Sequence, residues 1–324
     1  MSHAGDRSAQ GPSGYVRSVT PEHRLLSRRR LLHLGATTVV GLPVIALLNA
    51  CGESTSSSGD RSTNGSTDGA TGGAALPPEA ILAARWIPTE LGPGSQRLPV
   101  SVGDAAGLSQ EGPDRLLADV ISLADDSTVV ERLFADRRSL GEGTIPFWTF
   151  RTSLTEPGFY ALVVDGGPAE GAAFQIQDPA DLVVNRAGDR LDGFDTPTFD
   201  DPRGVEVICT RQPEPCPFHD LTLTEALATG KPVVYLVGTP AHCQTGVCGP
   251  VLDQLMELAD ELGDSVVFVH ADVYADVAAT EPAPAVTAAK LTFEPVLFVT
   301  DATGRIVERL DAVWDVDEVR ALLN

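Results

Sequence analysis

Residues 232–262 read PVVYLVGTPAHCQTGVCGPVLDQLMELADEL and combine a strand pattern, two cysteines and a helix pattern in one segment. Residues 232–238 are largely apolar, with several valines, which is typical of a buried strand. Over 251–262 the apolar residues recur at helical spacing. Cys243 and Cys248 therefore fall at a strand-to-helix junction, where unpaired backbone amides and the helix dipole stabilise a thiolate.

Further elements alternate on both sides of this stretch. A capping-box pattern over 222–225 predicts a short preceding helix, and a continuous apolar strand is expected over 265–271. Downstream we expect a weak helix, two strands of a hairpin and a last helix, over 283–290, 296–300, 305–310 and 315–323. The first two strands should be parallel through a right-handed crossover, with helices on both faces of the sheet. Residues 205–324 are therefore predicted to form a layered α/β domain.

This C-terminal stretch resembles the thioredoxin superfamily in its order of elements and in the residues that lead to Cys243. Glu294-Pro295 stands where that family has a cis-proline. The resemblance implies a thioredoxin-like fold in which Cys243 is the nucleophile, Cys248 resolves the mixed disulfide, and Pro295 shapes a groove for partners. The chain departs from the family in separating these cysteines by four residues instead of two, which leaves open which thiol is the more exposed.

Cys209 and Cys216 form a second close pair. Pairing each cysteine with its near neighbour requires the least rearrangement of the chain. We therefore expect a Cys209–Cys216 disulfide that acts as a structural staple, with a second redox centre as the alternative. For Cys243 and Cys248, the alternative to exchange chemistry is an inert disulfide on a domain that only docks partners.

Copper binding is the main competing hypothesis. Sco-type copper assembly proteins also place two nearby cysteines and a histidine on a membrane-anchored thioredoxin fold, which gives Cys243, Cys248 and His270 as the alternative ligand set. In that family the histidine lies far downstream of the cysteines, and no histidine follows His270 here. His270 is therefore predicted to be a core histidine and His219 a loop residue. The main hypothesis includes no metal or other cofactor.

Residues 76–178 show short apolar bursts separated by Gly, Pro and Asp, which is typical of β-rich structure. The clearest strands are expected over 116–123, 145–152, 159–164 and 172–176. The region contains no Cys or His, so we interpret it as a non-catalytic immunoglobulin-like β-sandwich. Residues 179–204 are predicted to be a linker. The expected fold class is thus an all-β sandwich followed by an α/β thioredoxin-like domain.

The N-terminal segment carries signals for export. Six arginines against two acids give residues 1–50 a charge of +4, which leaves −26 on the rest of a chain whose total is −22. Arg28 and Arg29 precede a short apolar stretch and resemble the twin-arginine export signal, and the sequence LNAC that ends at Cys51 resembles a bacterial lipobox. We expect residues 1–50 to be a lipoprotein signal peptide, followed by an acylated Cys51 and a flexible tether over 51–75.

The charge of the remaining chain argues against a nucleic-acid partner. The sequence predicts a thiol–disulfide oxidoreductase held by its lipid anchor on the extracytoplasmic face of the cell membrane. Its partners would be thiols or disulfides of other extracytoplasmic proteins. The two alternatives are a Sco-like copper-binding assembly factor and a docking lipoprotein without redox activity.

Overall fold

The computed structural model describes residues 73–124 and 129–324, all of which belong to one compact unit of the chain. The expected signal peptide, with Arg28, Arg29 and Cys51, lies outside the described residues. Of the residues that are described, 32% lie in strands and 16% in helices. None of the helices in this part of the chain has the length and apolar character needed to cross a membrane.

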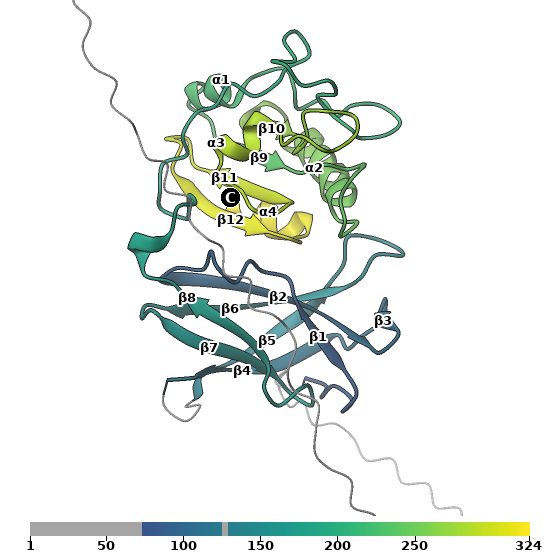
Figure 1. The fold of residues 1–324 in the computed structure, drawn as a ribbon, viewed down its shortest axis with the longest axis vertical. Coiled ribbons are helices and arrows are strands. Elements are labelled where there is room, and N and C mark those ends of the chain that lie inside the picture. The colour runs from purple at the N-terminus through teal and green to yellow at the C-terminus, as the bar shows by residue number, and fades with distance from the viewer. Residues whose placement is uncertain (1–72, 125–128) are drawn as a thin grey trace, which may run out of the picture. The chain divides into compact units, whose positions relative to one another are not determined.

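Eight strands form one antiparallel sheet in the first half of the described chain. They are β1 (Ile81–Ala84), β2 (Gly94–Asp104), β3 (Gly107–Leu108), β4 (Arg115–Ser122), β5 (Val129–Arg138), β6 (Phe147–Leu154), β7 (Gly158–Val164) and β8 (Ala172–Ile176). Their order is β1-β2-β6-β5-β4-β7-β8, with β3 paired to β2 (Figure 1). Most of β5 pairs with β4, whereas its last two residues, Arg137 and Arg138, pair with β6. Because β5 joins both halves and β1 contacts β8, the sheet is barrel-like and nearly closed.

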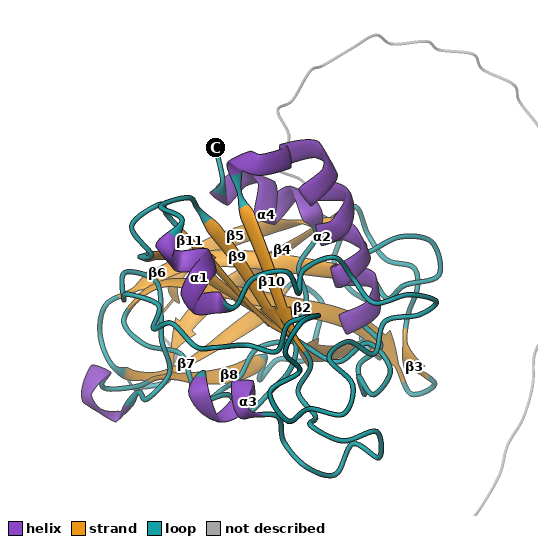
Figure 2. Ribbon diagram, turned by 90° about the horizontal axis from the view of Figure 1, so that it is seen from above, coloured by secondary structure: helices purple, strands orange, loops and turns teal. Residues whose placement is uncertain are grey.

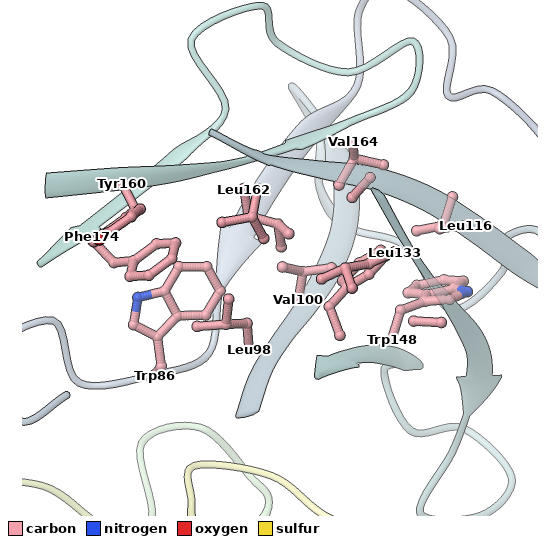
Figure 3. Packing of buried hydrophobic residues seen from close by; sticks show 14 of the residues in the cluster. Trp86, Leu98, Val100, Leu116, Leu133, Trp148, Tyr160, Leu162, Val164 and Phe174 are labelled. Atoms are coloured by element: carbon pink, nitrogen blue, oxygen red, sulfur yellow. The ribbon is translucent and has the colours of Figure 1, made fainter. Parts of the chain in front are cut away.

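The inside of this sheet is filled by large apolar side chains that alternate with outward-facing ones along each strand. In β4, for example, Leu116, Ala118 and Val120 are fully buried and the residues between them are partly exposed. Figure 3 shows Trp86 and Trp148 among the aliphatic side chains of this core. The Trp148 indole N–H donates a hydrogen bond of 3.1 Å to the Pro113 carbonyl, so its polar atom is satisfied.

A second sheet of four strands occupies the C-terminal half. It contains β9 (Val233–Val237), β10 (Val267–Ala271), β11 (Val296–Thr300) and β12 (Ile306–Asp311) in the order β10-β9-β11-β12. Strands β9 and β10 are parallel, as predicted, and β11 is antiparallel to both β9 and β12. The helices are α1 (Leu223–Ala228), α2 (Cys248–Leu262), α3 (Pro284–Ala288) and α4 (Val316–Leu322), with 3₁₀ turns η1 (Pro179–Asp181) and η2 (Gly263–Ser265).

The alternation of side chains along β9 directs its residues into two apolar layers. Val234 and Leu236 pack with residues of α2 and α4, which lie side by side (Figure 2). Val233, Tyr235 and Val237 face the other way, toward α1 and α3. Helix α2 is therefore fixed by its apolar stripe against the sheet, and this fixes the position of Cys248 at its first turn.

The predicted fold class is wrong, although most of the predicted elements exist. The described chain is mostly β, and three of its four α-helices have only five to seven residues. In place of a sandwich of two separate sheets, β5 bends from one half of the sheet to the other and produces the barrel-like form. The protein is therefore not an immunoglobulin-like sandwich followed by an α/β thioredoxin-like domain.

Two ion pairs tie the barrel-like sheet to the C-terminal residues. The Arg97 guanidinium of β2 pairs with the Glu318 carboxylate of α4 at 2.6 Å, and both side chains are almost fully buried. Arg138 of β5, whose side chain is partly exposed, pairs with Asp315, the N-cap of α4, at 2.8 Å. Because a buried charge that loses its partner is costly, the Arg97–Glu318 pair holds α4 against β2. Helix α4 in turn supports α2, which carries Cys248.

Candidate functional site

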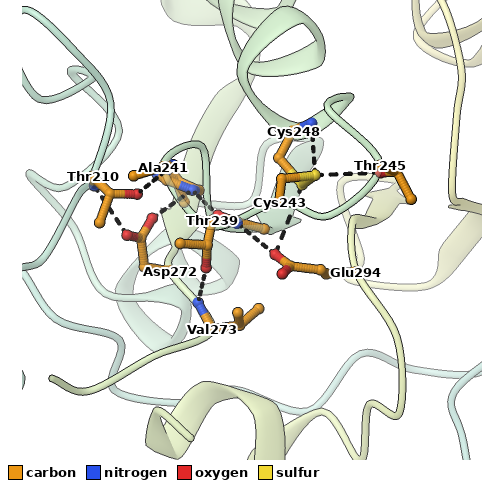
Figure 4. Close-up of a disulfide and its surroundings, with 11 residues drawn as sticks. Thr210, Thr239, Ala241, Cys243, Thr245, Cys248, Asp272, Val273 and Glu294 are labelled. Atoms are coloured by element: carbon orange, nitrogen blue, oxygen red, sulfur yellow. Dashed lines mark hydrogen bonds and ion pairs between the residues drawn. A yellow bond between two sulfur atoms is a disulfide. The ribbon is translucent and has the colours of Figure 1, made fainter. Parts of the chain in front are cut away.

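The structure places Cys243 and Cys248 in a disulfide at the junction between β9 and α2, with Cα atoms 5.9 Å apart (Figure 4). Cys248 is the first residue of α2 and is fully buried, whereas Cys243 lies in the preceding loop and is partly exposed. A partner molecule can therefore approach the sulfur of Cys243 and not that of Cys248. The structure thus answers which of the two sulfurs is the more accessible.

Polar hydrogens converge on the accessible sulfur. The Cys248 backbone N–H, at the N-terminus of α2, donates to Cys243 Sγ at 3.2 Å, and the Thr245 hydroxyl lies 3.3 Å from the same sulfur. When the disulfide is reduced, both groups can stabilise a thiolate on Cys243, and the dipole of the 15-residue helix α2 acts in the same direction. The loop therefore favours an ionised, reactive Cys243.

A partly buried carboxyl group lies beside the interior sulfur. Glu294 Oε2 is 3.7 Å from Cys248 Sγ and accepts a 2.7 Å hydrogen bond from the Thr239 backbone N–H. Its partial burial raises the pKa of Glu294, despite the opposing effect of this hydrogen bond. The carboxyl group can therefore give a proton to Cys248, or take one from it. In the sequence, Glu294 stands out only as the residue before Pro295.

The segments around the disulfide approach each other closely. The Glu294–Pro295 peptide bond is cis, as the sequence predicted. A side chain at Gly238, the residue after β9, would place its Cβ 3.1 Å from Pro295 Cβ and 3.7 Å from Cys248 Cβ. The first of these distances is tighter than ordinary packing, so a residue larger than glycine at position 238 would require Pro295 to move by a few tenths of an ångström.

The predicted Cys209–Cys216 disulfide is absent. Both cysteines are free thiols, and both are buried. The rings of His219 and His270 lie in the same cluster as the two thiols. Cys216 Sγ lies 3.3 Å from His270 Nδ1, and Cys209 Sγ lies 3.7 Å from the same nitrogen. The two thiols therefore make their contacts with imidazoles in place of a covalent bond.

The ligand set of the copper hypothesis is not brought together. Among the described residues, the only group of Cys, His or acidic side chains that could hold a metal ion is Cys209, Cys216, His219 and His270. His270 is fully buried, as predicted, but its ring belongs to this group and not to that of Cys243 and Cys248. His219, which the sequence analysis interpreted as a loop residue, is also fully buried. The one available signal was its spacing, three residues after Cys216.

The pKa values of the four buried side chains are shifted in different directions. A hydrogen bond from Cys216 lowers the pKa of the Cys209 thiol far below its usual range, and the same contact raises the pKa of Cys216. Burial lowers the pKa of His219, so its imidazole is neutral. Burial also opposes the charging of His270, but its hydrogen bond to Cys209 and the charge of Asp272 outweigh that effect and raise its pKa. The cluster therefore favours a thiolate on Cys209.

Comparison with known proteins adds no assignment to this geometry. No protein-family model matches the chain, and a search of curated proteins finds no significant relative. The function must therefore be argued from the two cysteine sites themselves.

The close packing at Gly238 predicts a selective effect of adding one methyl group. Gly238→Ala should lower the free energy of unfolding by about 1 kcal/mol, because Pro295 must shift to accept the new Cβ. Gly249→Ala is the matched control, since a Cβ at this position in α2 meets nothing within 4 Å. It should leave stability unchanged or raise it by up to about 1 kcal/mol. Urea unfolding of the two variants checks the difference, and equal effects would contradict the described packing.

Proposed function

We propose that the protein exchanges thiols and disulfides with other proteins through Cys243 and Cys248. The observation that carries this proposal is the contrast between the two sulfurs, one partly exposed and hydrogen-bonded at a helix N-terminus, the other buried beside a carboxyl group. This contrast assigns them the two separate roles that disulfide exchange requires, attack on a partner and release of that partner. A disulfide that served only to staple the loop would need neither arrangement.

In one direction, the Cys243 thiolate attacks a partner disulfide. A Cys243–partner disulfide forms, and the other partner sulfur leaves as a thiolate and takes a proton from water. The Cys248 thiol then attacks Cys243 Sγ while ionised Glu294 accepts its proton, and the partner leaves with its second thiol reduced. The protein is oxidised to the Cys243–Cys248 disulfide and the partner disulfide is reduced.

The reverse sequence uses the same groups. A partner thiolate attacks Cys243 Sγ, the bond to Cys248 breaks, and protonated Glu294 gives its proton to the departing Cys248 thiolate. A second partner thiolate then displaces Cys243, so the partner is oxidised and the protein is reduced. The raised pKa of Glu294 suits both directions, because it makes the carboxyl group a better proton acceptor when ionised and keeps it protonated to higher pH than an exposed glutamate.

We further propose that this exchange takes place on the extracytoplasmic face of a membrane, with the protein held there by a lipid on Cys51. The paired arginines Arg28 and Arg29 and the sequence ending at Cys51 support this location. The partners would then be exported proteins, whose thiols are in an oxidising environment.

The assignment of the two sulfurs predicts which single variant accumulates a mixed disulfide. Reduced Cys248→Ser should form a stable adduct with oxidised glutathione on Cys243, because no second thiol remains to release it. Reduced Cys243→Ser is the matched control and should form much less adduct, because Cys248 is buried. Intact-protein mass spectrometry measures both, with circular dichroism to show that both are folded. Equal adduct formation, or none in Cys248→Ser, would rule out the proposed roles.

The role of Glu294 predicts a pH-dependent effect. In the wild type, the release of a partner from Cys243 should become faster as pH rises through the raised pKa of Glu294, since only the ionised carboxylate accepts the Cys248 proton. Glu294→Gln should remove this dependence and slow release by about 10²-fold. Stopped-flow measurement of glutathione release from the mixed disulfide gives the rate at each pH.

Stability provides an independent check on Glu294. A raised pKa means that the carboxyl group contributes its full stability below the usual carboxyl range and loses that contribution as pH rises through the raised value. The melting temperature of Glu294→Gln should therefore rise relative to the wild type as pH increases toward neutrality. An unchanged pH profile in both rate and stability would exclude a proton-transfer role for this residue.

A further inference from the structure

We propose that Cys209, Cys216, His219 and His270 form a structural Zn²⁺ site, separate from the exchanging pair Cys243 and Cys248. Two thiolates and two imidazoles are the donors that tetrahedral zinc takes in closed protein sites. This inference is independent of the proposed exchange activity, because neither of the exchanging cysteines is a ligand.

The three distances from His270 Nδ1 to the other donors are close to those expected in a tetrahedron around one ion. With Zn–S near 2.3 Å and Zn–N near 2.0–2.1 Å, a sulfur and a nitrogen ligand should be about 3.5 Å apart and two nitrogens about 3.3 Å apart. In the structure His270 Nδ1 lies 3.3 Å from Cys216 Sγ, 3.7 Å from Cys209 Sγ and 3.3 Å from His219 Nε2. All four ligand atoms lie within 4.8 Å of one another.

Hydrogen bonds among the four side chains cannot satisfy all of their donor and acceptor atoms. His270 Nδ1 faces two sulfurs and a second ring nitrogen, yet a ring nitrogen either donates one hydrogen or accepts one. The four side chains are at most 5% exposed, so bulk solvent does not reach the remaining lone pairs. A divalent cation at the centre would bind all four donors at once, and its charge would balance two thiolates.

The groups behind the ligands are those that zinc sites use to orient their donors. His270 Nε2, the nitrogen that points away from the cluster, lies 2.8 Å from the Gly238 carbonyl, and Asp272 lies 3.5 Å from it. The Cys216 backbone N–H points to Cys209 Sγ at 3.4 Å, which stabilises a thiolate there. Such contacts fix the ring orientation and the charge state of metal ligands.

The position of the cluster in the fold indicates a structural and not a catalytic ion. All four coordination positions are taken by protein donors, whereas catalytic zinc keeps one open. Cys209, Cys216 and His219 come from one loop, and His270, 51 residues after His219, comes from β10. The ion would therefore hold the loop that precedes α1 against the end of β10. It would also keep Cys209 and Cys216 from forming disulfides with other cysteines.

The metal content of the purified protein tests the site. Full-length protein prepared with Zn²⁺ and then dialysed should retain about one zinc ion per chain. Inductively coupled plasma mass spectrometry measures this metal content. His219→Ala should lose it, with affinity reduced by roughly 10²-fold or more, whereas His219→Cys should keep it because a thiolate replaces the imidazole. His242→Ala, which removes an exposed histidine from the Cys243 loop, is the matched control and should retain zinc.

A second measurement covers the case in which His219→Ala does not fold. Wild-type protein loaded with Co²⁺ should show the intense visible bands of tetrahedral cobalt and the ultraviolet band of cobalt–thiolate bonds, and Zn²⁺ should abolish both. Absence of zinc and of these bands would overturn the proposal, as would a Cys209–Cys216 disulfide in the metal-loaded protein. Stoichiometric Cu⁺ binding without Zn²⁺ binding would overturn the assignment to zinc.

Discussion

The two ring nitrogens of His270 engage groups from two different sites. Nε2 lies 2.8 Å from the carbonyl of Gly238, the residue that leads from β9 into the loop of the disulfide. Nδ1 points to Cys216 and His219 at 3.3 Å each, inside the buried cluster. Because this ring is fully buried and held at both ends, it links the start of the disulfide loop to the cluster of Cys209 and Cys216.

Thr210 provides a second connection between the same two sites. It follows Cys209, its backbone N–H donates to the Asp272 carboxylate at 2.9 Å, and its hydroxyl accepts from the Ala241 backbone N–H at 3.2 Å (Figure 4). Ala241 lies two residues before Cys243 in the exposed loop. A metal ion that fixed the Cys209 loop would therefore also restrict the segment that carries the reactive sulfur, without touching it.

The sequence predicted the local elements better than their assembly. The apolar patterns located β4, β6, β7 and β8 and all four strands of the second sheet to within a few residues. They did not locate β1, β2, β3 or β5. In β5 most of the side chains are exposed or charged, and the strand shows no long apolar run. Because β5 connects the two halves of the barrel-like sheet, missing it led to the wrong fold class.

The candidate sites differ in the same way. Cys243 and Cys248 were found because the strand, the loop and the helix that position them are consecutive in sequence. The contact between His219 and His270 depends on how a loop packs against a strand 51 residues later, which no local pattern encodes. Glu294 was overlooked for the same reason, since its proximity to Cys248 arises only from the pairing of β11 with β9.

The two cysteine pairs are in different chemical states, one a disulfide and the other a pair of buried free thiols. Alkylation of the zinc-loaded protein in two steps with light and heavy iodoacetamide distinguishes these states. After mild reduction, the light reagent should label Cys243 first and Cys248 more slowly as its helix turn opens, and leave Cys209 and Cys216 for the heavy reagent after chelation and unfolding. Light label on Cys209 and Cys216 equal to that on Cys243, or a disulfide that joins the two pairs, would show that the two pairs do not differ in this way.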